Sequence, residues 1–261
     1  GGCRAGEGYV RAGGDCCGVK AQNAFGLSRH IPSDVKRAVR RQCGFGCAIC
    51  GATITEYEHF FPDFADAEGH DPSQITLLCP THHALATKGT IPKEQVRDAH
   101  LSPAAKAQGF SSYNHPWFTG IPALKMGGGP LVKGVQIPIQ FKGENLIQFD
   151  APEQGSEVAR ISASLRDATG NQFLKIEQNE WRVMAGEWDF QSVGKRYIFT
   201  DSSHQPMLSL RMEPPNFIAI ELLRTSIDGV PVHITEEKMS IGTNNFTGGI
   251  FSGCRVGICI N

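Results

Sequence analysis

Two short clusters of potential metal ligands are the most informative feature of this sequence. Cys47 and Cys50 form one Cys-x-x-Cys pair, and Cys79 and His82 form a second pair with the same spacing. A turn or a helix start can aim two ligands with this spacing at one metal ion, and two such pairs complete the tetrahedral set that zinc prefers. The sequence therefore predicts one structural Zn2+ bound by all four residues. Cys43 is close enough in sequence to compete for one of these places.

Three further polar residues lie beside these clusters and are not needed by a closed zinc site. Glu58 and His59 end a strand-like run between the clusters, and His83 directly follows His82. Carboxylate and imidazole groups next to a metal are typical of hydrolytic sites, so we expect chemistry here. Two alternatives remain open: Glu58-His59 is an ordinary exposed pair on a strand, or His83 replaces His82 as a zinc ligand. A nearby histidine, His70, is interpreted as a loop residue and left out of the site.

The stretch from Arg29 to about Ser112 resembles the zinc-stapled branch of the HNH endonuclease family. The resemblance is carried by Cys47-x-x-Cys50, Tyr57-Glu58-His59, Ile75-Thr76-Leu77-Leu78-Cys79 and Thr81-His82-His83. It implies a ββα-metal fold, in which a two-stranded hairpin and one helix surround a single divalent cation. It also implies metal-dependent hydrolysis of DNA phosphodiester bonds.

The same resemblance implies a role for each of four residues. His59 resembles the general base that takes a proton from the attacking water, a role suited to an imidazole. Glu58 and His83 resemble the ligands of a catalytic divalent cation, Mg2+ or a transition metal, which would stabilise charge on the scissile phosphate. Gln74 stands where the family usually has Asn. It would orient His59 by a hydrogen bond if its longer side chain is accommodated.

Contact with DNA must come from a local basic surface, because the chain carries a net charge of only -1 and has a pI near 6.8. Phosphate affinity requires locally concentrated Lys and Arg. A helix is predicted to begin near Ser33, and residues three and four apart share one face of it. The candidate DNA contacts are Lys36, Arg37, Arg40 and Arg41 on this helix, and Lys88, which would replace a basic residue that relatives carry near Ala86. A solvated helix surface is the alternative for the first four.

Proline and glycine punctuation divides the chain into four regions. Residues 1–28 form a glycine-rich arm, and residues 29–115 form the expected nuclease domain, with helices starting at Ser33, near Thr81 and near Pro92. Residues 116–134 contain several prolines and Gly127-Gly128-Gly129, which predicts a linker. Residues 135–261 form the last domain.

The last domain is predicted to be all-β, because short segments alternate apolar and polar residues between turns. The clearest pair places Leu208, Leu210 and Met212 opposite Ile218, Ile220 and Leu222, and a second pair joins residues 161–165 to 174–176. The predicted fold class is therefore α+β, with the all-β domain either a sandwich or a short β-solenoid. The solenoid alternative comes from the small and Asn-rich residues of the segment 243–258.

The role of this β domain is open. It would recognise a DNA sequence, a modified base or an activating signal, or it would join copies of the chain into a homo-oligomer that cuts both strands. Trp181 and Trp188 are candidates for a platform on which bases stack, with burial in the core as the alternative.

The function that these residues favour is a metal-dependent endonuclease acting on double-stranded DNA, of the kind used in bacterial restriction or defence. A zinc-stabilised DNA-binding module without catalysis and a ligand or partner sensor are the alternatives. The sequence contains no run of about twenty apolar residues, so no membrane span is expected. The scattered cysteines and the zinc ligands favour a reducing, cytoplasmic location.

Overall fold

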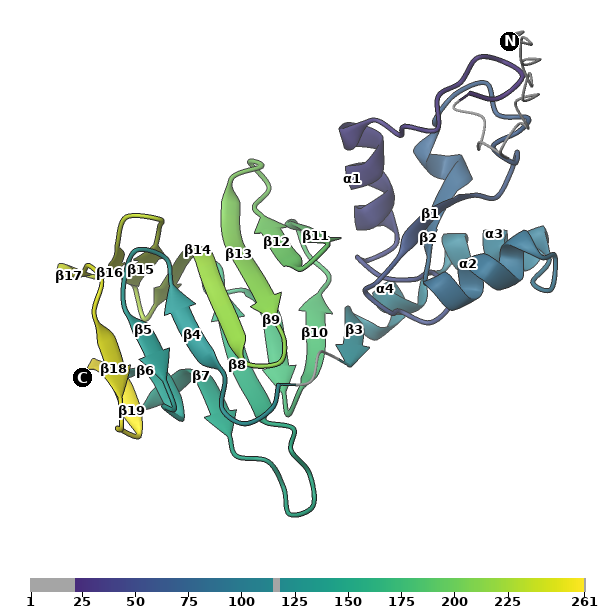
Figure 1. Cartoon of the computed structure of the whole chain (residues 1–261). Coiled ribbons are helices and arrows are strands. Elements are labelled where there is room, and N and C mark those ends of the chain that lie inside the picture. Colours follow the sequence, from purple (N-terminus) through teal and green to yellow (C-terminus); the bar gives the residue numbers. More distant parts are fainter. Residues whose placement is uncertain (1–21, 115–117, 261) are drawn as a thin grey trace, which may run out of the picture.

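The computed structural model describes residues 22–114 and 118–260. All the helices lie in the described residues 22–108, here called the helical half, and strands β3 to β19 lie in residues 110–260, here called the β half (Figure 1). The chain is thus mostly β with a few helices, in the predicted order. Residues 1–21 of the predicted glycine-rich arm lie outside the described residues. In the described part, no helix is both long and apolar enough to cross a membrane.

The helical half contains a two-stranded antiparallel sheet flanked by helices. Its elements are α1 (Ser33–Gln42), β1 (Glu56–His59), the 3-10 helix η1 (Pro72–Gln74), β2 (Ile75–Leu78), α2 (Pro80–Thr87), α3 (Lys93–Leu101) and α4 (Ala104–Gln108). In the β1–β2 pair Glu58 lies opposite Thr76 and His59 lies opposite Ile75.

Prolines start these helices. Pro32, Pro92 and Pro103 are the N-cap residues of α1, α3 and α4, and Pro80 is the first residue of α2. Proline is tolerated at a helix start because the first backbone N–H groups have no partner within the helix. The helix predicted near Ser33 is confirmed, but its N-cap is Pro32 rather than Ser33.

Strand β2 is the centre of the helical half, because all four of its residues are buried. Ile75 and Leu77 pack with Ile31, Val39 and Cys43 of the α1 side. Leu78 belongs to a second cluster with Phe60, Ala86, Ile91, Val96, Cys47 and Cys79. Both clusters are small, so this half has little apolar core of its own.

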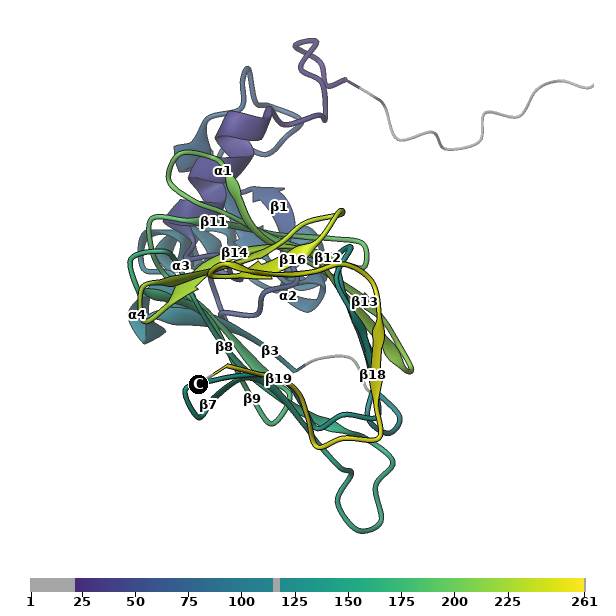
Figure 2. The same cartoon turned by 90° about the vertical axis from the view of Figure 1, so that its left-hand side faces the viewer.

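The β half consists of two sheets stacked as layers (Figure 2). Among the described residues the first sheet has the order β19 (Val256–Ile260), β6 (Ile137–Phe141), β7 (Glu144–Asp150), β8 (Arg160–Arg166), β9 (Gln172–Glu177), β10 (Glu180–Met184) and β3 (Phe110–Asn114). The second follows β11 (Asp189–Val193), β12 (Arg196–Thr200), β13 (Pro206–Glu213), β14 (Phe217–Ile227), β15 (Val230–Ile234), β16 (Met239–Ile241) and β17 (Asn244–Phe246), with β4 (Ala123–Met126), β5 (Leu131–Lys133) and β18 (Ile250–Ser252) attached.

The core of the β half lies between the two layers. Phe149 and Leu174 of the first sheet and Leu208 and Ile220 of the second belong to one buried cluster. Of the two predicted β architectures, the sandwich is therefore confirmed and the solenoid is wrong. The segment expected to form solenoid corners instead supplies strands that pair in parallel with β5 and β6.

The predicted strand pairs are present with one irregularity. Leu210 lies opposite Ile220 and Met212 opposite Ile218, whereas a register shift after Ser209 places Leu208 opposite Leu223 instead of Leu222. In the second predicted pair, β8 and β9 align as expected.

The described part of the predicted linker, residues 118–134, belongs to the sandwich. Strand β4 pairs in parallel with β14 and antiparallel with β5. Gly128 donates a backbone hydrogen bond to Thr235 O, and a Cβ atom added at Gly127 or Gly128 would overlap the backbone of residues 235–237. These glycines allow two backbones to approach closely, which a composition rich in glycine cannot distinguish from a flexible linker.

Trp181 and Trp188 are core residues, with exposed fractions of 2% and 8%. The indole ring of Trp181 lies against the ring of Tyr197, and Trp188 donates its Nε1–H to Met184 O at 2.7 Å. The expected stacking platform for bases is therefore wrong.

A buried ion pair joins the two halves. Arg40 of α1 donates to both carboxylate oxygens of Asp189 in β11, at 2.8 and 2.6 Å, and donates a third hydrogen bond to Tyr57 Oη at 2.6 Å. Burial alone would lower the pKa of Arg40, but its hydrogen bonds with Asp189 and the charges of Tyr57 and Asp189 raise it instead. The guanidinium is fully engaged within the protein.

This ion pair corrects the expected DNA-binding face of α1. The Arg40 side chain is buried and paired with Asp189, so its guanidinium is not available for the predicted phosphate contact. Its neighbours also face the β half: Arg41 pairs with Glu187 at 2.6 Å, and Arg37 lies 3.6 Å from Asp189. The regularly spaced arginines of α1 therefore face acidic residues of the same chain. Lys36 remains half-buried beside the Tyr57 ring.

We expect Asp189→Ala to destabilise the protein by about 3 kcal/mol, because it leaves the Arg40 guanidinium buried without a counter-ion. Urea denaturation followed by circular dichroism measures this change. The matched control is Glu187→Ala, which removes an 86% exposed carboxylate from the Arg41 pair and should cost less than about 1 kcal/mol. Equal effects from the two variants would show that the buried pair does not hold the halves together.

Candidate functional site

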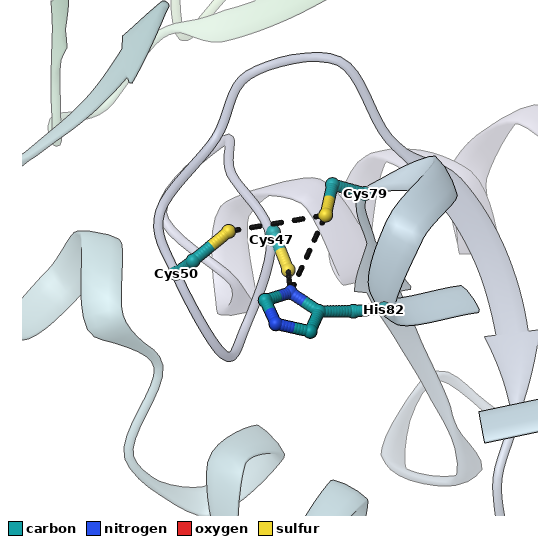
Figure 3. Close-up of side chains that lie close together, drawn as sticks. All are labelled: Cys47, Cys50, Cys79 and His82. Carbon is teal, nitrogen blue, oxygen red and sulfur yellow. Dashed lines mark hydrogen bonds between the residues drawn. The ribbon is translucent and has the colours of Figure 1, made fainter. Parts of the chain in front are cut away.

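Cys47, Cys50, Cys79 and His82 converge as predicted (Figure 3). The His82 Nδ1 atom lies 3.4 Å from Cys47 Sγ and 3.3 Å from Cys79 Sγ, and the sulfur atoms of Cys50 and Cys79 are 3.9 Å apart. A tetrahedron with Zn–S bonds of about 2.3 Å has edges of about 3.8 Å, so the spacing fits one ion. This Cys3His cluster could hold a metal ion, consistent with structural zinc.

Local backbone geometry directs these ligands. Cys47 and Cys50 lie in a tight turn in which Gly51 N donates to Cys47 O at 2.7 Å and Cys47 N donates to Ala52 O at 2.8 Å. Gly51 has φ +75°, a conformation that favours glycine. Cys79 is the N-cap of α2 and His82 lies in its first turn, so a turn and a helix start face each other.

The environment of the Cys50 thiol disfavours its ionisation in the absence of a cation. Burial, followed by the proximity of Cys47 and Cys79, raises the pKa of the Cys50 thiol to about 12. A bound divalent ion reverses this tendency, because metal coordination deprotonates thiols. The chemistry of the donor set therefore fits Zn2+.

The two alternative zinc ligands lie elsewhere. Cys43 is buried in the other small cluster, with its Sγ atom 3.4 Å from Thr76 Oγ1. The His83 ring points to carboxylates rather than to the thiols: its Nε2 atom lies 3.0 Å from Glu58 Oε2 and its Nδ1 atom 3.4 Å from Glu56 Oε2. His82 thus belongs to the thiol cluster, whereas His83 contacts the carboxylates of β1.

Glu58 and His83 form the second group. The Glu58 side chain, 12% exposed, reaches His83 with one oxygen and Lys93 Nζ with the other, at 3.1 Å. Lys93 also contacts Asp63 at 2.5 Å. A carboxylate and an imidazole side by side could provide two ligands for a divalent cation. The sequence reasoning missed Lys93, because its position at the start of α3 shows no spacing relation to Glu58.

His59 lies next to this group and is half-buried. Its Nε2 atom is 3.1 Å from Nδ1 of His70, and its ring lies edge-on to the Phe64 ring at 5.5 Å between centroids. Burial, and then the charges of His70 and Arg29, lower the pKa of His59 to about 4. The imidazole is therefore neutral at neutral pH and can accept a proton.

Gln74 does not take the place predicted for it. Its backbone carbonyl accepts a hydrogen bond from Phe60 N at 3.1 Å, and Gln74 lines a surface cleft with Pro62, Asp66 and His70. Within residues 22–114 and 118–260, no hydrogen bond joins the Gln74 amide to the His59 ring. His70, which the sequence reasoning set aside, is the side chain that contacts His59.

Glu58, His59, His83 and Lys93 line one open cleft of about 410 Å³, together with Arg29 and other residues. The Arg29 guanidinium stacks over the Phe64 ring at 4.5 Å. Lys88, the remaining candidate for a DNA contact, is exposed at the C-cap of α2. The cleft thus combines a neutral imidazole, a carboxylate–imidazole pair and cationic groups.

No family model matches the chain, and no curated protein and no solved structure is similar to it. Its function must therefore be argued from the geometry of the site.

We expect Cys50→Ala to lose one equivalent of zinc per chain and to unfold the helical half, because metal binding there contributes folding free energy. Elemental analysis by mass spectrometry and the helical circular dichroism signal measure the two effects. Cys254→Ala, which removes an exposed thiol of the β half, is the control and should leave both unchanged. A wild-type protein purified without zinc, or a variant that retains it, would contradict the assignment.

Proposed function

We propose that this chain is a metal-dependent endonuclease of the HNH type that hydrolyses DNA phosphodiester bonds. The observation that carries the proposal is that His59 and the Glu58–His83 pair line the same cleft, next to the Cys3His cluster. The hairpin β1–β2 followed by α2 supports a ββα-metal arrangement, because β1 supplies Glu58 and His59 and the first turn of α2 supplies His83.

The residues of the cleft divide the chemistry among them. Glu58 and His83 would hold the divalent cation, Mg2+ or another, which when bound stabilises charge on the scissile phosphate and on the leaving oxygen. His59 takes the proton of the attacking water, for which a neutral imidazole is required. Lys93 and Arg29 place positive charge beside the substrate phosphates.

The β half is proposed to supply target recognition, regulation or oligomerisation, in a role such as bacterial restriction or defence. Trp181 and Trp188 are buried, so neither is available to stack on bases. On the helical half, exposed Lys88 remains the proposed phosphate contact, whereas the arginines of α1 serve the interface between the halves.

A second candidate is a zinc-stabilised DNA-binding module without catalysis. The observation that favours it is the position of Gln74, whose amide does not reach the His59 ring in the described structure. Such a module would bind duplex DNA without cleaving it.

We expect His59→Ala to lower metal-dependent cleavage of supercoiled plasmid about 100-fold or more, because it removes the general base. Gel electrophoresis after incubation with Mg2+, Mn2+ or EDTA measures nicking and linearisation. The matched control is His233→Ala, an exposed histidine on β15. Undiminished cleavage by His59→Ala would sink the base assignment, and a gel shift without cleavage by the wild type would favour the second candidate.

A further inference from the structure

We propose that His70 is a positioning residue that orients the imidazole of His59 and determines which of its nitrogens carries the hydrogen. The proposal rests on the nuclease function proposed above. His70 lies outside the motif residues, in the loop that precedes η1, and its contact with His59 follows only from the folded structure.

The hydrogen-bonding capacity of the Ser28 carbonyl determines which ring nitrogens of His70 and His59 carry hydrogens. His70 Nε2 lies 2.9 Å from the carbonyl oxygen of Ser28, which can only accept, so His70 Nε2 donates. In a neutral His70 the other nitrogen, Nδ1, is then an acceptor. It lies 3.1 Å from His59 Nε2, which must therefore donate. The Nδ1 atom of His59 remains as the nitrogen with a free lone pair, able to take a proton.

The loop that carries His70 is held at both ends. Asp71 accepts hydrogen bonds from the backbone N and the hydroxyl of Ser73 at 2.9 and 2.8 Å, which starts η1. On the other side, Asn23 donates to the carbonyl oxygens of Phe64 and Ala67 at 2.7 and 2.6 Å. The segment that contains Ser28 is thereby attached to the loop before His70. A histidine in an unconstrained loop would not have these restraints.

His70 occupies the role for which Gln74 was predicted. A base needs a partner on its second nitrogen, because an imidazole with the wrong tautomer presents N–H instead of a lone pair to the water. Gln74 and His70 line the same surface cleft, but in the described structure only His70 forms a hydrogen bond with the His59 ring, and Phe64 contacts that ring as well. The orienting group is thus supplied by the loop before η1 rather than by Gln74 at the end of η1.

A shared metal ion is the competing explanation for two histidine nitrogens at this distance. Among the described residues, the one group of three or more potential ligands close enough for a metal site is the Cys3His cluster. Unlike the Glu58–His83 pair, the His59–His70 pair contains no carboxylate, and its two nitrogens lie at hydrogen-bond distance, which favours a hydrogen bond over coordination.

Two variants separate positioning from a structural role. His70→Ala removes the acceptor for His59 Nε2–H, and His70→Asn retains an amide oxygen that can accept it. We expect His70→Ala to lower kcat on a labelled DNA duplex about 10- to 100-fold, with KM within about twofold, and His70→Asn to recover part of the loss. His233→Ala is again the control. An unchanged kcat in His70→Ala, or equal losses in the Ala and Asn variants, would overturn the proposal.

Imidazole nitrogen NMR tests the same contact without any activity. We expect a single Nε2–H tautomer for His59 in the wild type and a mixture of tautomers in His70→Ala. The signals of His59 are assigned as those that disappear in His59→Ala. An Nδ1–H tautomer in the wild type, or no change in His70→Ala, would overturn the positioning role whether or not the protein cleaves DNA. Loss of bound metal in His70→Ala would show coordination instead. If the tautomer result holds and no cleavage occurs, the nuclease proposal fails and the contact stands.

Discussion

A guanidinium buried in a protein requires a carboxylate beside it, and the structure of this chain depends on how Arg40 meets that requirement. Its partner, Asp189, comes from the other half of the chain, so the two halves can only associate in an arrangement that brings α1 and β11 together. The same side chain also donates to Tyr57, the residue between Glu56 and Glu58 on β1. Successive strand residues point to opposite faces, so Tyr57 faces Arg40 while its neighbours face His83. The Arg40 guanidinium thus links the docking of the β half to the position of the strand that carries Glu58 and His59.

The first turn of α2 contributes a side chain to each of the two groups of the site. His82 contributes to the thiol cluster and His83 contacts the carboxylates of β1, and adjacent residues of a helix point in directions about 100° apart. A metal ion in the Cys3His cluster would therefore also determine where His83 lies. The apolar clusters around β2 are small, and in a half so poor in core residues a metal ion held by these four potential ligands would add rigidity.

The features predictable from the sequence were those encoded locally. Ligand pairs with a spacing of three residues, helices started by proline and strands with alternating apolar residues all follow from neighbours in the chain, and the structure contains them. The predictions that were wrong concern residues whose environment depends on a segment far away in the sequence. The arginines of α1 have the pattern of a solvent-exposed basic face, but the carboxylate that Arg40 meets is 149 residues away. Gly127 and Gly128 have the composition of a linker, but their small size serves a close approach to residues 235–237. His70 carries no motif, and only the folding of its loop against Ser28 gives it a partner in His59.

The parallel strand pairs of the sandwich have a consequence for the order of folding. Strand β4 pairs with β14 and β6 pairs with β19, so segments separated by long stretches of chain must meet before either sheet is complete. Such contacts require loop closure before they contribute stability, and domains that depend on them fold slowly. The helical half connects elements that are closer in sequence, so we expect it to form first. Arg40 must then remain solvated until β11 arrives. The hydrogen bonds between Arg40 and Asp189 therefore form last, after the strand that carries Glu58 and His59 has paired with β2.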